Sequence, residues 1–192
     1  VRGAYGKPAR QYIDLFADVG RVHPDDLDMI GRHLGGREPV LDVGCGPGHL
    51  TGLLRTLGCD PIGVDPVAEL VDHARVTEPG CRFALGALPT LPLRDHSVTG
   101  VLAWYSLIHL EPAPLDDALA ELRRVMTAGG VLVLGFFDGD RVDAFDHKVA
   151  TAHRWPVDEL SGRLTRAGFT EAERQQRPGI DVVGQRPHAA LV

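Results

Sequence analysis

The sequence predicts an α/β fold of the doubly wound type, in which helices cover both faces of a mostly parallel sheet. Apolar runs of strand length alternate with segments whose apolar residues recur at helical spacing. The first of these runs stops at an acid and then breaks into alternating glycines. With 192 residues, the chain can form one substantial core but not two ordinary enzyme domains, so we expect a single domain over residues 1–192.

The glycine-rich stretch between Pro39 and Leu50 predicts a strand, a tight turn and the start of a helix. Its glycines stand at Gly44, Gly46 and Gly48. Because glycine tolerates a positive φ and lets a ligand approach the backbone, this spacing predicts a nucleotide cradle.

The same stretch disfavours a dinucleotide. A dinucleotide fingerprint would place its third glycine at position 49, where this chain has His49. Asp42 ends the preceding strand, where it would repel a pyrophosphate and would suit a ligand that carries positive charge. An NAD(P)-dependent oxidoreductase is therefore the less favoured alternative.

The run from Leu41 to Gly48, Leu-Asp-Val-Gly-Cys-Gly-Pro-Gly, resembles the first motif of the class I S-adenosylmethionine-dependent methyltransferases. The resemblance covers nearly the whole chain from Pro39 onward. It implies a Rossmann-like methyltransferase fold with a seven-stranded, mostly parallel sheet whose last strand is antiparallel. It also implies S-adenosyl-L-methionine as the cofactor and S-adenosyl-L-homocysteine as the product. This ligand carries an ammonium and a sulfonium but no phosphate, which fits the acid at the strand end.

Two helices are predicted before the glycine-rich stretch, between Tyr5 and Leu34, and the second begins at Pro24. In similar methyltransferases a helical N-terminal segment folds over the cofactor, so residues 1–36 are expected to form a lid. Tyr12 either lines this lid or simply packs against its neighbours.

A helix after the glycines ends at Gly58, and a second strand follows at residues 61–64. Asp65 comes about twenty residues after the first loop glycine, where nucleotide-binding α/β folds place an acid that accepts from ribose hydroxyls. Asp65 and Pro66 also fit an N-cap and a first helical position, and the two roles can coexist.

A short third strand at residues 81–85 leads into Gly86, Ala87 and Leu88, which are similar to the family's adenine-contacting loop. Ala87 stands where relatives often carry an acid, so backbone groups and apolar packing are expected to hold the adenine. The residues expected at the cofactor are Tyr12, Asp42, Gly44, Cys45, Gly46, Gly48, Asp65, Pro66, Ala87, Leu88, Tyr105 and Ser106.

The fourth strand, residues 101–105, ends where ligands bind in a doubly wound sheet, so Tyr105, Ser106 and His109 are expected at the site. His109 is the candidate catalytic base, because the unperturbed pKa of histidine lies near neutrality. Relatives often carry histidine here, so His109 either removes a proton or only orients the loop.

A helix over residues 115–126 and a buried fifth strand at residues 131–137 come next. Residues 138–156 lose this periodicity, and we expect a lid or substrate loop, with a solvated surface excursion as the alternative. Phe137, His153 and Trp155 are the candidate acceptor contacts. No metal is expected, because His147 and His153 lack a specific ligand spacing.

A last helix from Pro156 to Gly168 and an antiparallel pair at residues 169–174 and 187–192 complete the predicted sheet.

Composition limits the kinds of partner that we expect the protein to bind. A formal charge of −6 argues against broad nucleic-acid binding, and no window approaches the roughly 20 apolar residues that cross a bilayer. The three cysteines lack metal-like pairing, and no secretory leader pattern opens the chain, so we expect a cytoplasmic protein with reduced thiols. We expect a small-molecule acceptor, no nucleic acid, no membrane, and a monomer or homodimer. A cofactor-binding member without catalysis is the alternative, because fold does not fix function.

Overall fold

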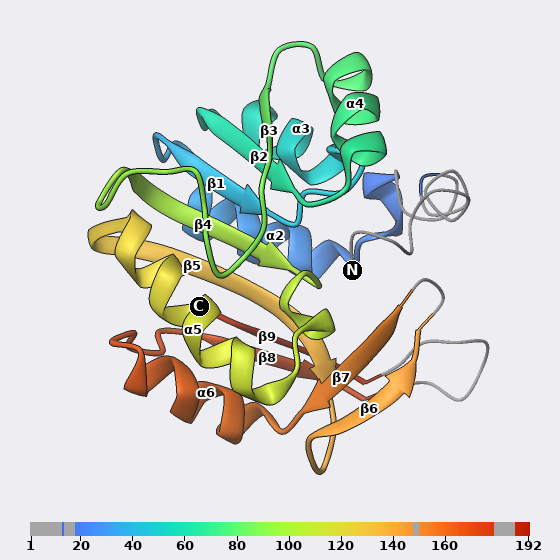
Figure 1. The fold of residues 1–192 in the computed structure, drawn as a ribbon, viewed down its shortest axis with the longest axis vertical. Coiled ribbons are helices and arrows are strands. Elements are labelled where there is room, and N and C mark those ends of the chain that lie inside the picture. Colours follow the sequence, from blue (N-terminus) through green and yellow to red (C-terminus); the bar gives the residue numbers. More distant parts are fainter. Residues whose placement is uncertain (1–12, 14–17, 148–149, 179–186) are drawn as a thin grey trace.

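The computed structural model describes residues 13, 18–147, 150–178 and 187–192 (Figure 1). Tyr12 and most of the first predicted helix lie outside these residues. The second predicted helix is confirmed as α2, Pro24–Leu34, which follows the short 3-10 turn η1, Val19–Arg21.

Five parallel strands form the centre of the sheet in the order β3-β2-β1-β4-β5. Their bounds are Val40–Val43 for β1, Pro61–Asp65 for β2, Arg82–Leu85 for β3, Val98–Trp104 for β4 and Met126–Asp138 for β5. β1 pairs with β2 on one side and with β4 on the other. The strand order therefore reverses beside β1, and this switch point opens a crevice at the carboxyl ends of the strands.

Helices cover both faces of the sheet, which confirms the predicted doubly wound α/β class. The remaining helices are α3, His49–Thr56, α4, Ala68–Thr77, α5, Pro112–Val125, and α6, Val157–Arg166. The buried residues Leu119 of α5 and Leu160 of α6 belong to one core cluster, whereas Ile30 of α2 and Leu54 of α3 belong to another. Figure 1 shows α5 and α6 on the face of the sheet opposite α2. None of the helices in the described part of the chain is long and apolar enough to span a membrane.

The predicted antiparallel end of the sheet is confirmed with one shift. β9, His188–Leu191, pairs antiparallel with β5, and β8, Arg174–Arg177, pairs antiparallel with β9. The prediction that this pair begins at Phe169 is wrong. The Phe169 amide donates to the Leu164 carbonyl at 3.0 Å, so Phe169 lies in the turn that closes the end of α6 and not in a strand.

The sequence predicted that residues 138–156 are irregular. They instead contain an antiparallel hairpin. Its strands are β6, Asp143–Asp146, and β7, Thr151–Trp155. β7 also pairs in parallel with Phe137 and Asp138 of β5, beyond the point where β4 ends. The described residues therefore form a nine-stranded sheet instead of a seven-stranded one.

Charged side chains hid the hairpin from pattern analysis. Arg154 pairs with Asp143 across the two strands at 2.9 Å, and its guanidinium lies 4.3 Å from the centre of the Phe145 ring. Only Ala152, His153 and Trp155 of β7 are buried, so the apolar signal is short.

Trp155 was predicted to contact the acceptor, but it is only 2% exposed and packs in the main core cluster. The Arg163 guanidinium of α6 lies 5.0 Å from its ring centre. The structure thus gives Trp155 a place in the core.

We expect Trp155→Ala to lower the free energy of unfolding by about 3–5 kcal/mol, because it empties a fully packed site. Urea denaturation measures this loss. The control is Val76→Ala on α4, where the side chain is 78% exposed, and it should change stability by less than about 0.5 kcal/mol. Similar small changes for both variants would contradict the core placement.

Candidate active site

A cavity of about 280 Å³ lies at the carboxyl ends of β1, β2 and β4. Its lining includes the predicted residues Gly44, Asp65, Pro66, Ala87, Leu88, Tyr105, Ser106 and His109. Apolar side chains such as Val67, Leu70 and Leu107 supply much of the remaining wall. Segments far apart in the sequence therefore converge at the switch point of the sheet, where ligands of doubly wound folds bind.

The glycine loop closes the cavity where β1 turns into α3. Gly44, Gly46 and Gly48 all have positive φ, at 72°, 53° and 91°. A Cβ on Gly44 would lie 2.3 Å from the Ser106 Cβ, and a Cβ on Gly48 would lie 2.8 Å from the Ala74 Cβ. Both the backbone conformation and the space therefore require glycine at positions 44 and 48.

Asp42 is 2% exposed and lies at the centre of the sheet, but it is not among the residues that line the cavity. Its Oδ2 accepts a hydrogen bond from the Thr51 hydroxyl of α3 at 2.6 Å. Burial raises the pKa of Asp42 to about 7, although the Thr51 hydrogen bond opposes this shift and the nearby Asp65 adds to it. In this structure Asp42 joins β1 to α3.

Cys45, Gly46 and Gly48 were also predicted at the cofactor, and they too are absent from the cavity lining. The Cys45 side chain is only 3% exposed, and burial raises the pKa of its thiol. These residues shape the loop, whereas Gly44 forms the wall.

Asp65 lines the cavity at the end of β2, and its carboxylate is fixed by two backbone amides. Oδ2 accepts from the Gly46 amide at 3.0 Å, and Oδ1 accepts from the Val67 amide at 2.9 Å. Burial raises the pKa of Asp65 against the opposing effect of these two bonds. Each carboxylate oxygen keeps further acceptor capacity for a ligand hydroxyl.

The predicted N-cap role of Asp65 is wrong. Helix α4 begins at Ala68, and its N-cap residue is Val67, which makes no side-chain capping bond. Pro66 therefore precedes the helix, and it lines the cavity.

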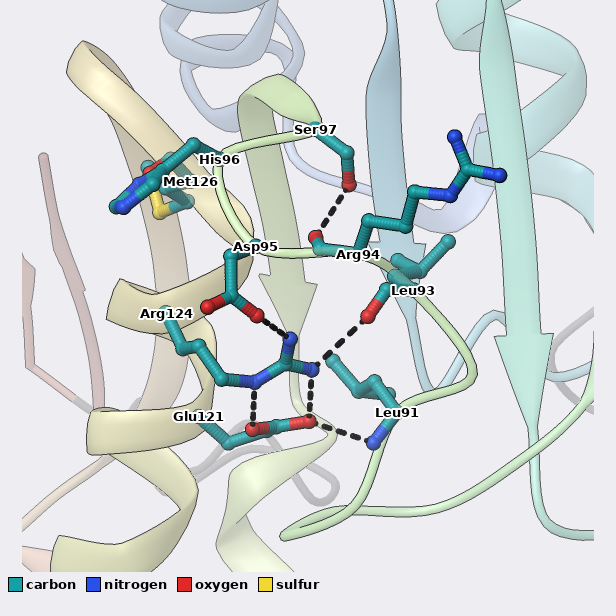
Figure 2. A network of polar contacts seen from close by, with 9 residues as sticks. All are labelled: Leu91, Leu93, Arg94, Asp95, His96, Ser97, Glu121, Arg124 and Met126. Carbon is teal, nitrogen blue, oxygen red and sulfur yellow. Dashed lines mark hydrogen bonds and ion pairs between the residues drawn. The ribbon is translucent and has the colours of Figure 1, made fainter.

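Beyond Ala87 and Leu88, the chain from Leu91 to Asp95 is held to α5 by ion pairs and hydrogen bonds, as Figure 2 shows. Glu121 of α5 accepts from the Leu91 amide at 2.7 Å. Arg124 binds Glu121 through two nitrogens, each at 2.7 Å, and also donates to the Leu93 carbonyl and to Asp95. This network holds the chain between β3 and β4 against α5.

His109 lines the cavity from η2, Leu107–His109, and its ring is oriented by the β6–β7 hairpin. Its Nδ1 lies 2.9 Å from the Thr151 carbonyl oxygen. A carbonyl only accepts, so Nδ1 carries the proton and Nε2 keeps a lone pair in the neutral ring. Burial lowers the pKa of His109, with the Thr151 bond opposing and His153 contributing, so the neutral form is favoured.

His153 and Phe137 have different environments. His153 is 8% exposed and its Nδ1 donates to the Ile108 carbonyl at 3.3 Å, so it fastens β7 to η2 from inside. Phe137 is half-buried beside the site, with its ring centre 4.7 Å from that of Tyr105. Among the described ring contacts of the three predicted acceptor contacts, the one with a cavity-lining residue is that of Phe137 with Tyr105.

Sequence reasoning missed the partners of Tyr105. The Tyr105 hydroxyl forms a hydrogen bond with Nδ1 of His188, and His188 Nε2 lies 3.3 Å from Asp26 Oδ1. Asp26 lies in the first turn of α2, where an acid is ordinary, and His188 has no local pattern that would mark it. The positions of Asp26 and His188 near Tyr105 depend on contacts between segments that are distant in the sequence.

Comparison with known proteins agrees with this geometry. Residues 40–130 match the family model described as a methyltransferase domain. An uncharacterized methyltransferase from Mycobacterium tuberculosis is 39% identical over 95 residues, which are 50% of this chain and 38% of that protein. A malonyl-[acyl-carrier protein] O-methyltransferase from Yersinia pestis is 32% identical over 133 residues, which are 69% of this chain and 48% of that protein. The chain thus spans about half or less of the length of the curated relatives it matches.

Among solved structures, the fold is similar to that of 1,6-didemethyltoxoflavin-N1-methyltransferase from Burkholderia thailandensis, which was crystallised with 1,6-didemethyltoxoflavin and S-adenosylhomocysteine. The TM-score is 0.76 at 20% identity, and the match covers 96% of this chain and 84% of that one. The chain therefore has the fold of the S-adenosylmethionine-dependent methyltransferases among these solved structures, and residues 40–130 are similar to a methyltransferase domain.

We expect Gly44→Ala to destabilise the fold by roughly 2–5 kcal/mol, because it adds both backbone strain and a clash with Ser106. Gly36→Ala is the matched control: Gly36 also has a φ of 72°, but nothing lies within 4 Å of its added Cβ, so only the strain of about 1–2 kcal/mol remains. Urea denaturation gives both values.

A second substitution separates the backbone strain of Gly44→Ala from its clash with Ser106. With Ser106→Gly added, the nearest remaining Ser106 atom is Cα at 3.4 Å, so the cost of Gly44→Ala should fall to that of the control. No relief in the double variant would show that the close approach to Ser106 is not the cause.

Proposed function

We propose that this chain is an S-adenosylmethionine-dependent methyltransferase that acts on a small-molecule acceptor in the cytoplasm. The observation that carries the proposal is a cavity whose described lining includes Asp65 but no lysine or arginine. A pyrophosphate would require positive charge or free amides there, whereas an uncharged ribose and a cationic sulfonium fit an acidic site. The NAD(P) alternative is disfavoured on the same ground.

The residues that line the cavity fit the parts of the cofactor. We propose that the Asp65 carboxylate accepts from two ribose hydroxyls and that Ala87 and Leu88 contact the adenine, since all three residues line the cavity. Gly44 and Ser106 supply a wall without bulky side chains for the methionyl part. When bound, S-adenosylmethionine would supply the methyl group of its sulfonium, and S-adenosylhomocysteine would leave as a neutral thioether without acid assistance.

The protein then contributes chiefly position. When an acceptor is held in line with the methyl group in a closed site, this positioning can lower the activation free energy by roughly 7–11 kcal/mol. We propose that Nε2 of His109 accepts the proton of an acceptor that arrives protonated, since its lone pair is fixed by the Nδ1 bond to Thr151. The β6–β7 hairpin, which holds His109, is proposed as part of the acceptor side of the site.

The other partner assignments are proposals of the same kind. The formal charge of −6 argues against nucleic acid as the acceptor. Cys45, Cys59 and Cys81 are all free thiols, which suits a reducing compartment. A monomer or a homodimer is compatible with this chemistry.

Calorimetric titration tests cofactor choice. We expect S-adenosylhomocysteine to bind and NAD to give no heat. Asp65→Asn should weaken S-adenosylhomocysteine binding about 10-fold to 100-fold, because an amide replaces charged acceptors for the ribose. The control Asp72→Asn alters an exposed acid of α4 and should leave the affinity unchanged. If NAD bound and S-adenosylhomocysteine did not, the proposed cofactor would be wrong.

A screen of metabolites with methyl-labelled cofactor identifies the acceptor, and His109 variants then test the base. We expect His109→Ala to lower kcat on the order of 10²–10⁴-fold with little change in S-adenosylhomocysteine affinity. In the wild type, kcat should fall as the pH drops through a pKa below 6.5, because burial lowers the pKa of His109 and only the neutral ring accepts a proton.

His109→Asn is the discriminating variant, because its amide can still donate to the Thr151 carbonyl but cannot take a proton. Recovery of wild-type turnover in His109→Asn would show that His109 only orients the loop.

A further inference from the structure

A second cavity lies at the edge of the sheet opposite the proposed cofactor site. It has a volume of about 260 Å³ and is formed by the amino end of β5, the turn after α6 and the end of β9. A water molecule takes up about 30 Å³ in the liquid, so this cavity has room for a ligand of roughly eight non-hydrogen atoms. None of the described residues lines both cavities, and the proposed function does not use this one.

The second cavity has an apolar floor and an exposed rim. Buried leucines form the floor, each at most 8% exposed: Leu132 and Leu134 of β5, Leu164 of α6 and Leu191 of β9. Gly168, Thr170 and Glu171 lie on the rim and are exposed. An apolar floor with a few polar groups at the mouth is typical of small-molecule sites.

Arg123, in the last turn of α5, supplies positive charge to this cavity. Its Nη1 lies 3.5 Å from the Met126 carbonyl oxygen, and its Nε would lie 3.7 Å from a Cβ added to Gly168. Met126 and Gly168 both line the cavity, so these contacts place the guanidinium at the cavity wall. In the described part of the chain, no carboxylate forms an ion pair with Arg123.

Glu171, the one acid among the described residues that line this cavity, is already bound. Its carboxylate accepts from Arg174 Nε at 2.6 Å, from Arg174 Nη2 at 2.9 Å and from the Ser161 hydroxyl. These bonds hold the pKa of Glu171 below its usual value. Arg123 is therefore the charged lining group with donors left for a ligand, and its planar guanidinium matches a carboxylate.

We propose that the second cavity binds a small carboxylate with an apolar chain of about five carbons, a size that its volume allows. The chain contacts the leucine floor, and the carboxylate pairs with Arg123. This inference goes beyond the proposed function and does not depend on it. The two cavities then select opposite charges, because Asp65 lines one of them and Arg123 lines the other.

Calorimetric titration with hexanoate, hexanol and hexylammonium tests the ligand class, because the three probes have similar chains and differ in the charge of the head group. We expect hexanoate to bind with a dissociation constant on the order of 1 mM or below. Hexanol should bind at least about fivefold more weakly, and hexylammonium more weakly still. Absence of hexanoate binding, or equal affinity for hexanoate and either of the other probes, would overturn the proposal.

Arg123→Gln tests the carboxylate contact, because it removes the charge and keeps a flexible polar side chain. It should weaken hexanoate binding about fivefold and change hexanol binding less than about twofold. Arg94→Gln is the matched control, since Arg94 is an exposed arginine that lines neither cavity, and it should leave both affinities unchanged. Thermal unfolding confirms that the variants are folded, and unchanged hexanoate binding in folded Arg123→Gln would contradict the contact.

Methyl NMR locates the ligand in the wild type without any substitution. Hexanoate should shift the resonances of Leu164 and Leu191 and leave those of Leu70 and Leu107, at the proposed cofactor site, unchanged. The affinity for hexanoate should be the same with S-adenosylhomocysteine present. Shifts confined to Leu70 and Leu107, or competition between the two ligands, would overturn the second site. Absence of S-adenosylhomocysteine binding would instead remove the proposed function and leave the hexanoate result standing.

Discussion

The close approach of Gly44 to Ser106 is the constraint on which the rest of the site depends. It brings the loop after β1 against the loop after β4, and the two strands are neighbours in the sheet. The contact leaves no room for a Cβ on Gly44, so the backbone itself forms the wall of the cavity. The same contact fixes Ser106, and with it the strained Tyr105 on one side and η2 with His109 on the other. A single steric condition thereby sets the position of groups from both halves of the sheet.

The charges around the cavity favour a ligand without phosphate. Asp42 and Asp65 are both buried, and neither forms an ion pair with a described lysine or arginine. Backbone amides hold Asp65, and a hydroxyl holds Asp42, so no described lysine or arginine offsets the burial that raises the pKa of both carboxyls. A cationic ligand would relieve the cost of keeping these carboxylates ionised, which is the physical reason that the site suits a sulfonium.

The central elements were predictable from the sequence because their signals are local. The glycines require positive φ at fixed positions, and the strands before them are continuous apolar runs. Asp65 was found for the same reason, since it ends a strand at a set distance from the glycine loop. Its N-cap role was wrong because α4 begins only at Ala68, and the carboxylate instead bridges the Gly46 and Val67 amides.

The elements that sequence analysis missed depend on pairing between distant segments. The β6–β7 hairpin is amphipathic only after Arg154 has paired with Asp143 and covered Phe145. The group formed by Tyr105, His188 and Asp26 comes from β9, α2 and the end of β4, and nothing in the spacing of the three residues indicates that they meet. Such buried polar groups become visible only when the fold brings distant segments together.

The most direct test of the central claim is a crystal structure of the protein with S-adenosylhomocysteine. We predict that its ribose hydroxyls lie within hydrogen-bond distance of Asp65 and that its adenine lies against Ala87 and Leu88. A ligand found elsewhere, for instance in the cavity of about 260 Å³ between α6 and the amino end of β5, would contradict the assignment of the site.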